Sequence, residues 1–357
     1  MKRTILLSSL FFSLFMTLFS QDIQIPQWVD NEIKQTYTRF IEWKGDDDVV
    51  LFPIQTDVHS GGRETFKHVA YVNHAAKTFK FDFIADLGDI GLDTPATKDP
   101  KEASEFLKRH ADIHQQYQGI SVVLVGNHDH NRIAGDKRFT DKQLGEIFNA
   151  PSMKKSNGRL VLAENPTYGY IDIPARKTRV FFMNTCDRDD EKNYYTMAPK
   201  QLQFLADNLK TKEEGWNAFV LTHFCVLKLG HWTDDNSECA HAETYLRILK
   251  DCNAKAKGES DGVKWDFSQG AVCHVVANLT GDSHFDAEEN HDGIYFAISQ
   301  GYGGVGVNSM PKWSSKTYFD PNQQMLVDIV AYKPATHQLK LFRIGAGGAP
   351  KDREFKW

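Results

Sequence analysis

The stretch VVLFPIQTDVH, residues 49–59, joins a run of apolar residues to an aspartate and a histidine. Its apolar part has the length and the β-branched content of a buried strand. Residues 63–77 then carry apolar side chains at helical spacing. The sequence therefore predicts a strand, a loop and a helix, with the Asp57 and His59 side chains in the loop.

The same alternation recurs along the chain. Residues 81–87 and 120–125 are typical of buried strands, and residues 102–117 between them are typical of a helix. Such alternation predicts an α/β protein with a mostly parallel core sheet. Further elements are expected as strands over 178–184, 218–222, 272–280, 294–299, 325–331 and 339–344, and as a helix over 199–209. The strand-rich second half predicts a second sheet packed on the first.

Side chains of the kinds that bind metals stand directly after these strands. They are Asp57 and His59, Asp86 and Asp89, the run Gly126-Asn127-His128-Asp129, His223, and Asp282 with His284. Open α/β sheets place their sites at the carboxyl ends of strands. Carboxylate, amide and imidazole ligands together suit zinc, manganese or iron, whereas magnesium and calcium prefer oxygen ligands alone. The pattern favours a centre for two divalent ions.

The order D-x-H, G-D, G-N-H-D, H and G-x-x-H resembles the signature of calcineurin-like metallophosphoesterases and extends over most of the chain. The resemblance implies a four-layer α/β sandwich, in which two mixed β-sheets are flanked by helices. It implies two divalent ions, of manganese, iron or zinc, and a hydroxide between them that attacks phosphorus. The implied ligands are Asp57, His59 and His284 for one ion, Asp89 as the bridge, and Asn127 and His223 for the second ion.

His128 matches the family histidine that stabilises the transferring phosphoryl group or protonates the leaving oxygen. A histidine can do either because its pKa lies near working pH. Asp93, which follows Asp89 by four residues, is a candidate to orient His128 by accepting from its ring. A solvated loop carboxylate is the alternative for Asp93.

The sequence departs from the family pattern at Asp282, where the family most often has a histidine. A carboxylate there can still bind the second ion, and it would favour a harder ion than zinc. If Asp282 faces away from the centre, the second ion loses a ligand.

Residues near these motifs are candidates for contact with the substrate. They are His130, Arg132, Arg63, Tyr302 and His241. Arginine offers a planar fork for phosphate, and the polar segment 224–241 directly follows His223, where a substrate-selecting lid is expected. The alternative for each is an ordinary loop residue at the surface.

The start of the chain and its net charge indicate where the protein is located and what it binds. Residues 1–20 combine a basic start with an apolar run, which predicts a cleaved signal peptide and an exported protein, periplasmic or secreted. The alternative, a permanent membrane anchor, needs a longer apolar run.

Residues 21–40 are expected to be a lead-in and residues 41–357 a single domain. The net charge of -5, without a long basic run, argues against nonspecific nucleic-acid binding. Five cysteines leave disulfide pairing open.

The expected activity is hydrolysis of a phosphate monoester on a small organic molecule. A phosphodiesterase or nuclease differs only in whether the pocket admits a second ester group. A noncatalytic binding protein on the same scaffold, suggested by Asp282 alone, is the less favoured alternative.

Overall fold

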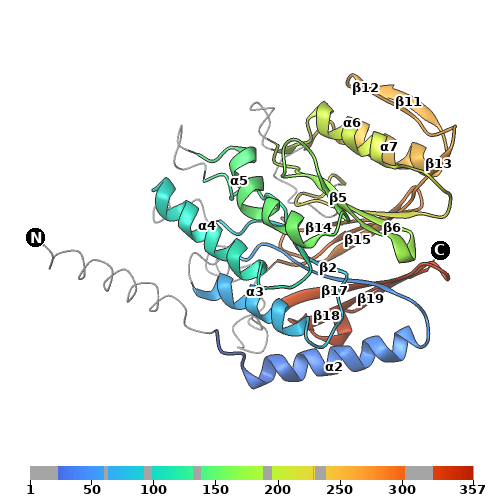
Figure 1. Ribbon diagram of the computed structural model, residues 1–357. Coiled ribbons are helices and arrows are strands. Elements are labelled where there is room, and N and C mark those ends of the chain that lie inside the picture. Colours follow the sequence, from blue (N-terminus) through green and yellow to red (C-terminus); the bar gives the residue numbers. More distant parts are fainter. Residues whose placement is uncertain are drawn as a thin grey trace, which may run out of the picture.

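Two β-sheets pack face to face, and helices cover their outer faces (Figure 1). The computed structural model describes residues 23–59, 63–91, 99–131, 138–187, 195–227, 229, 239–301 and 325–356. From the bottom of Figure 1 upward, the layers are helix α2, the first sheet, the second sheet, and helices α6 and α7. The four-layer sandwich expected from the sequence is confirmed.

The first sheet contains six strands, three of which are parallel neighbours. In order across the sheet they are β19 (Arg353–Lys356), β18 (Gln338–Gly345), β17 (Leu326–Lys333), β1 (Val50–Gln55), β2 (Phe83–Asp86) and β3 (Ile120–Val123). Strands β17 to β19 extend the parallel part as antiparallel neighbours. The carboxyl ends of β1, β2 and β3 therefore meet at one edge.

The second sheet has seven strands and is also mixed. In order they are β15 (Ala287–His291), β16 (Ile294–Ile298), β14 (His274–Thr280), β9 (Asn217–Leu221), β6 (Thr178–Phe182), β5 (Gly169–Ile173) and β4 (Leu160–Leu162). Strands β16, β14, β9 and β6 are parallel. Three short ribbons pair β7 (Tyr195–Thr196) with β10 (Cys239–Ala240), β8 (Lys210–Thr211) with β13 (Ala271–Val272), and β11 (Lys257–Ser260) with β12 (Val263–Asp266).

Helices occupy the outer faces of both sheets. Helices α2 (Gln27–Lys44) and α3 (Arg63–Ala75) contribute to the core outside the first sheet. Helix α4 (Pro100–His114) packs beside α3 and against β2 and β3 of the first sheet, and α5 (Asp141–Phe148) packs on α4. Helices α6 (Pro199–Asn208) and α7 (Ala242–Asn253) contribute to the core outside the second sheet. Short 3-10 helices span Ala150–Lys155, Pro174–Arg176 and Ala349–Lys351. Every strand and helix expected from the sequence is present. Helices α2, α5 and α7 and several strands, among them β4, β5, β15 and β19, are additional to them.

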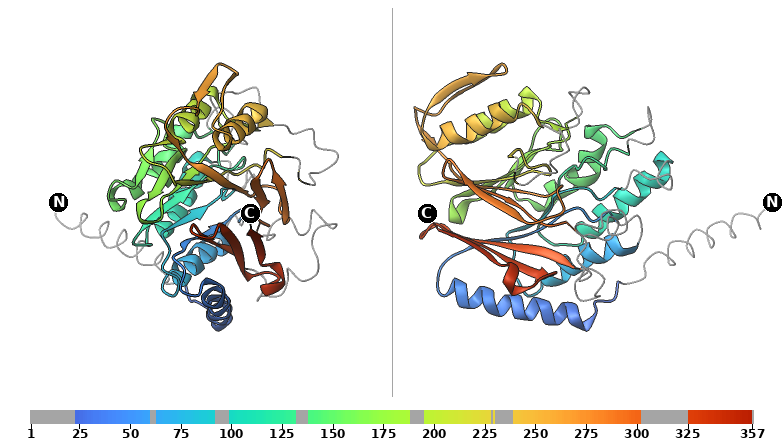
Figure 2. Two further views of the ribbon diagram at one scale, coloured as in Figure 1. Left: turned by 90° about the vertical axis from the view of Figure 1, so that its right-hand side faces the viewer. Right: turned by 180° about the vertical axis from the view of Figure 1, so that it is seen from behind.

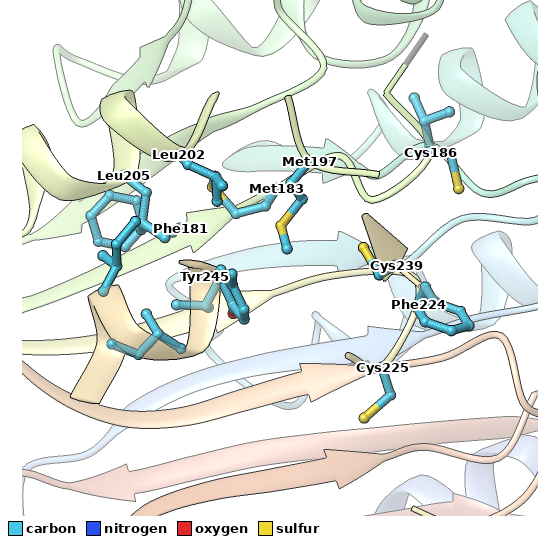
Figure 3. Packing of buried hydrophobic residues seen from close by; sticks show 14 of the residues in the cluster. Phe181, Met183, Cys186, Met197, Leu202, Leu205, Phe224, Cys225, Cys239 and Tyr245 are labelled. Carbon is cyan, nitrogen blue, oxygen red and sulfur yellow. The ribbon is translucent and has the colours of Figure 1, made fainter. Parts of the chain in front are cut away.

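Aromatic side chains fill the space between the sheets. Phe52 of the first sheet stacks on Phe83 with ring centroids 4.5 Å apart, and it meets Phe219 of the second sheet edge to face at 6.0 Å. A separate cluster lies outside the second sheet, where Phe181 and Tyr245 pack with residues of α6 (Figure 3). All five cysteines are buried and carry free thiols.

Helix α2 lies along the outside of the first sheet, below strands β17 to β19 (Figure 2). Its Phe40 packs edge to face on Phe342 of β18, with ring centroids 6.0 Å apart. Arg39 pairs with Asp352 near the other end of the chain at 3.0 Å. The segment expected as a lead-in thus supplies most of a helix that packs on the core.

The predicted signal peptide, residues 1–20, lies outside the described residues. Within the described part of the chain, no helix combines the length and the apolar character that a membrane span needs.

Candidate metal centre

Loops from both sheets converge at one edge and bring the seven predicted metal ligands together. They are Asp57 and His59 after β1, Asp89 after β2, Asn127 after β3, His223 after β9, and Asp282 with His284 after β14. Strand ends far apart in the sequence thus meet because the parallel strands of both sheets end on the same side.

The first set of side chains surrounds Asp57. Its Oδ1 atom lies 3.4 Å from Nε2 of His284 and 3.8 Å from Nε2 of His59. His59 Nε2 in turn lies 3.3 Å from Oδ2 of Asp89. These are separations that ligand atoms around one small cation adopt.

The second set surrounds His223. Its Nε2 atom lies 2.9 Å from Oδ1 of Asn127, 3.5 Å from Oδ2 of Asp89 and 3.3 Å from Oδ1 of Asp282. The same Asp89 oxygen therefore lies between His59 and His223. Asp282 faces this centre, so the departure from the family pattern keeps a possible ligand in place.

Backbone carbonyls orient the histidine rings. His59 Nδ1 lies 3.2 Å from the carbonyl oxygen of Gly91, and His223 Nδ1 lies 2.9 Å from that of Leu87. An Nδ1–H that donates to a carbonyl leaves the Nε2 lone pair free to bind a metal. Both rings are thus held with Nε2 directed at the centre.

Five of the seven ligands adopt left-handed backbone conformations, which non-glycine residues seldom adopt. The φ angles are 55° at Asp57, 36° at His59, 58° at Asp89, 66° at Asp282 and 57° at His284. Such conformations cost about 1–3 kcal/mol each and cluster at functional sites. The surrounding fold therefore imposes these conformations.

Two glycines of the motifs lie where a side chain has no room. A Cβ on Gly126 would lie 2.1 Å from Oδ1 of Asp89, and a Cβ on Gly281 would lie 1.9 Å from Oγ1 of Thr56. The Thr56 hydroxyl donates to Oδ2 of Asp57 at 2.6 Å. Glycine at both positions lets the backbone pass close to the ligands.

The charges of the centre also fit cations. Burial by itself would lower the pKa of His59, but the Asp89 carboxylate raises that pKa to about 9. Burial would raise the pKa of Asp89, and the neighbouring His223 and His59 hold it well below its usual value. Asp57 Oδ1 is buried and accepts no hydrogen bond from the described residues. A divalent ion bound among these carboxylates and imidazoles would give this oxygen atom a partner.

Asp129 holds two of the ligand loops together. Its carboxylate accepts hydrogen bonds from the backbone N–H groups of Gly126, Asp89, Ile90 and Gly91, at 2.7–3.0 Å. No role is predicted for Asp129 from the sequence, although it stands within the G-N-H-D motif. Its position shows that the last residue of this motif fixes the loop that carries Asp89.

Tyr195 has no signal in the sequence. Its hydroxyl donates to Oδ1 of Asp282 at 2.7 Å, and its ring stacks on Phe224 with centroids 3.9 Å apart. Tyr195 lies on the two-residue strand β7, and only the fold brings it to the centre.

His128 lies at the open side of the centre. Its side chain is 36% exposed, and its Nε2 atom is 3.9 Å from Oδ2 of Asp89. Its ring meets that of His59 edge to face at 4.9 Å. His128 is therefore placed where a substrate can reach it.

Two of the residues predicted to contact substrate pair with carboxylates outside the ligand set. His130 is buried and lies 2.8 Å from Asp141, an arrangement typical of a structural pair. His241 directly precedes α7 and pairs with Asp261 at 2.8 Å. Asp93, Arg132, Tyr302, the side chain of Arg63 and most of the predicted lid lie outside the described residues.

Comparisons with known proteins bear on the fold of the chain. Neither family models nor curated protein sequences gave a match. Among solved structures, the chain is similar to a dimetal phosphatase from Danio rerio, with 11% identity and a TM-score of 0.58 over 87% of this chain and 100% of that chain. It is also similar to GAP50, an inner-membrane-complex anchor of Plasmodium, with 11% identity and a TM-score of 0.44 over 86% of this chain and 89% of that chain. The similarity to the dimetal phosphatase shows that the chain has the fold of the calcineurin-like metallophosphoesterases.

Proposed function

We propose that this chain is an exported, metal-dependent phosphoric ester hydrolase that acts as a phosphomonoesterase on small organic phosphates. The observation that carries the proposal is the convergence of seven ligand side chains from both sheets, with one Asp89 oxygen between His59 and His223. Few arrangements other than a pair of cations place so many carboxylates and imidazoles around one point.

Two divalent ions, of manganese, iron or zinc, fit this arrangement. One ion would be held by Asp57, His59 and His284, and the other ion by Asn127, His223 and Asp282. Asp89 would bind both ions. When bound, such a pair activates water and neutralises charge on a phosphoryl group at neutral pH. The carboxylate of Asp282 favours manganese or iron over zinc in the second position.

The protein's own groups orient the substrate and handle its protons. His128, half-exposed beside Asp89, would stabilise the phosphoryl oxygens or protonate the leaving oxygen. General acid catalysis of this kind contributes about 10²–10⁴-fold. Asp129 and the motif glycines keep the ligand loops fixed, so little reorganisation accompanies the reaction.

Sequence features support the choice of substrate and location. The chain has a net charge of -5 and no long basic run, which favours a small phosphate ester over a nucleic-acid chain. The basic and apolar start over residues 1–20 favours export.

The activity is tested by comparing hydrolysis of p-nitrophenyl phosphate and bis-p-nitrophenyl phosphate by residues 21–357, supplied with manganese, iron or zinc. We expect faster hydrolysis of the monoester and its loss in Asp89→Asn. The exposed Asp207 of α6 gives a matched control, since Asp207→Asn leaves the centre intact. Preference for the diester would support the phosphodiesterase alternative. Metal binding without turnover of either ester would support the binding-protein alternative.

Export is tested by expressing the full chain in a bacterial host and determining the N-terminus of the product by mass spectrometry. We expect a product outside the cytoplasm that begins near Gln21. A chain that keeps residues 1–20 and stays with the membrane would contradict cleavage.

A further inference from the structure

A second group of metal-binding side chains lies beside the centre, in the interior of the protein. It contains Asp86 at the end of β2, His110 and His114 on α4, and Gln55 at the end of β1. The exposed fractions are 0% for Asp86, His110 and His114 and 2% for Gln55. The two histidines are four residues apart, so the helix presents both rings on one face.

The separations among Asp86, His110 and His114 suit one small ion, and Gln55 lies closer to Asp86 than a fellow ligand would. Asp86 Oδ2 lies 3.2 Å from Nε2 of His110 and 3.3 Å from Nε2 of His114. The Gln55 amide nitrogen lies 3.4 Å from Nε2 of His114 and 2.6 Å from Oδ2 of Asp86. Bonds of about 2.0–2.1 Å to a tetrahedral zinc ion place neighbouring ligand atoms about 3.3 Å apart.

Hydrogen bonds alone leave this group incompletely satisfied. One oxygen, Asp86 Oδ2, lies within 3.3 Å of the Gln55 amide nitrogen and of Nε2 of both His110 and His114. The Gln55 Oε1 atom is buried and has no hydrogen-bond partner among the described residues. A buried polar atom without a partner costs about 1–3 kcal/mol.

A cation would change which atom of Gln55 faces the group. The oxygen and nitrogen of a glutamine amide exchange places on rotation by half a turn. Rotation would direct Gln55 Oε1 toward the Asp86 carboxylate, which is unfavourable unless a positive ion lies between them. With an ion present, the amide oxygen becomes a ligand.

We propose that Asp86, His110, His114 and Gln55 bind a third divalent cation, with zinc the best match, separate from the pair at the catalytic centre. All four positions of a tetrahedron are then filled by protein atoms, which is the arrangement of structural zinc sites. The Ser121 hydroxyl lies 3.1 Å from Nδ1 of His114 and orients that ring, whereas Nδ1 of His110 has no hydrogen-bond partner among the described residues.

The third ion would support the catalytic centre from inside. The other Asp86 oxygen, Oδ1, accepts a hydrogen bond from the Gly88 N–H at 3.0 Å. The Gly88 carbonyl accepts one from the N–H of Asp57 at 2.9 Å. An ion that fixes Asp86 therefore fixes the turn that leads to Asp89. This role does not depend on the reaction that the centre catalyses.

The test counts ions in protein whose catalytic centre is disabled. A variant with Asp57→Asn and His223→Asn, saturated with zinc and freed of excess ion by gel filtration, is analysed for metal by mass spectrometry. We expect one zinc per chain in this variant and three in the unaltered chain. Adding His114→Gln should lower the variant's count from one to none. Adding His74→Gln, on α3 where the ring pairs with Asp30, should leave it at one.

Cobalt gives a second measurement that does not require the His114 variant to fold. The disabled variant loaded with cobalt should show the intense visible absorption of a four-coordinate ion. A folded disabled variant that holds no zinc and shows no such absorption would overturn the proposal. Two ions in the unaltered chain and none in the variant would leave the hydrolase proposal standing and refute the third site.

Discussion

Gly281 lies in the loop between β14 and the ligands Asp282 and His284. A methyl group at this position would displace the Thr56 hydroxyl, which hydrogen-bonds to Asp57. We expect Gly281→Ala to weaken metal binding by about 10- to 100-fold, as loss of outer hydrogen bonds usually does. Titration with manganese or zinc measures the change.

Gly270→Ala is a suitable control for that experiment. Gly270 has a φ of 81°, and a Cβ added there would meet no atom within 4 Å, so the substitution strains the backbone without touching the centre. It should lower the free energy of unfolding by about 1 kcal/mol and leave metal affinity unchanged. Equal metal affinity in both alanine variants would contradict the steric argument.

His128 is the candidate catalytic residue that is not a metal ligand. We expect His128→Asn to lower kcat by about 10²–10⁴-fold while the metal content stays the same. Steady-state kinetics with p-nitrophenyl phosphate, together with metal analysis, checks both parts. The half-exposed His291 of β15 provides the control, because His291→Asn removes a histidine outside the ligand loops. An unchanged kcat in the His128 variant would exclude this role.

Helix α2 tests whether the segment before the first strand is part of the domain. Phe40 is 4% exposed in the core, whereas its neighbour Ile41 is 43% exposed. We expect Phe40→Ala to lower the free energy of unfolding by about 3–5 kcal/mol. Ile41→Ala should change it by less than about 0.5 kcal/mol. Urea unfolding measures both, and similar small effects would show that α2 is a dispensable lead-in.

Burial on both faces explains why so many elements were predictable from sequence. Strands β1 and β9 are buried along their whole length, so their residues form continuous apolar runs. Strand β15, with the sequence AEENH, lies at an edge and is largely exposed, and no apolar pattern marks it. Helix α2 does carry Val29, Ile33 and Phe40 at helical spacing, but its position before the first core strand favoured a lead-in.

The candidate site was predictable to the extent that its residues follow strands in a recognisable order. The structure brings Asp57 and His284 together as that order predicts. Tyr195 and the group of Asp86 with His110 and His114 were not predicted, because their partners are set by packing between distant elements. No local spacing rule describes a tyrosine on a short ribbon.

At the scale of the molecule, the metal centre joins the two sheets. Asp57 and Asp89 follow strands of the first sheet, and His223 and His284 follow strands of the second. Ions bound there stabilise only the folded chain, by about 2.7 kcal/mol at a concentration 100 times Kd. We expect removal of metal by a chelator to lower Tm by about 4 °C for each ion lost, and manganese or zinc to restore it.

Calorimetry with and without chelator measures this shift. Asp89→Asn removes the bridging carboxylate, so its Tm should respond much less to added metal. A Tm that is independent of metal in the unaltered chain would mean that the loops hold their positions without ions.

The left-handed backbone of five ligands has a consequence for how this protein can evolve. Glycine at Asp57, His59, Asp89, Asp282 or His284 would relieve the unfavourable φ angle, so the same mutation that removes a ligand also removes strain. Such a mutation would stabilise the ion-free chain, whereas the ion-loaded chain would lose the stability that the ions supply. Selection for hydrolysis keeps these ligands in place, and without that selection glycine at these positions would be favoured only in an ion-free, inactive protein.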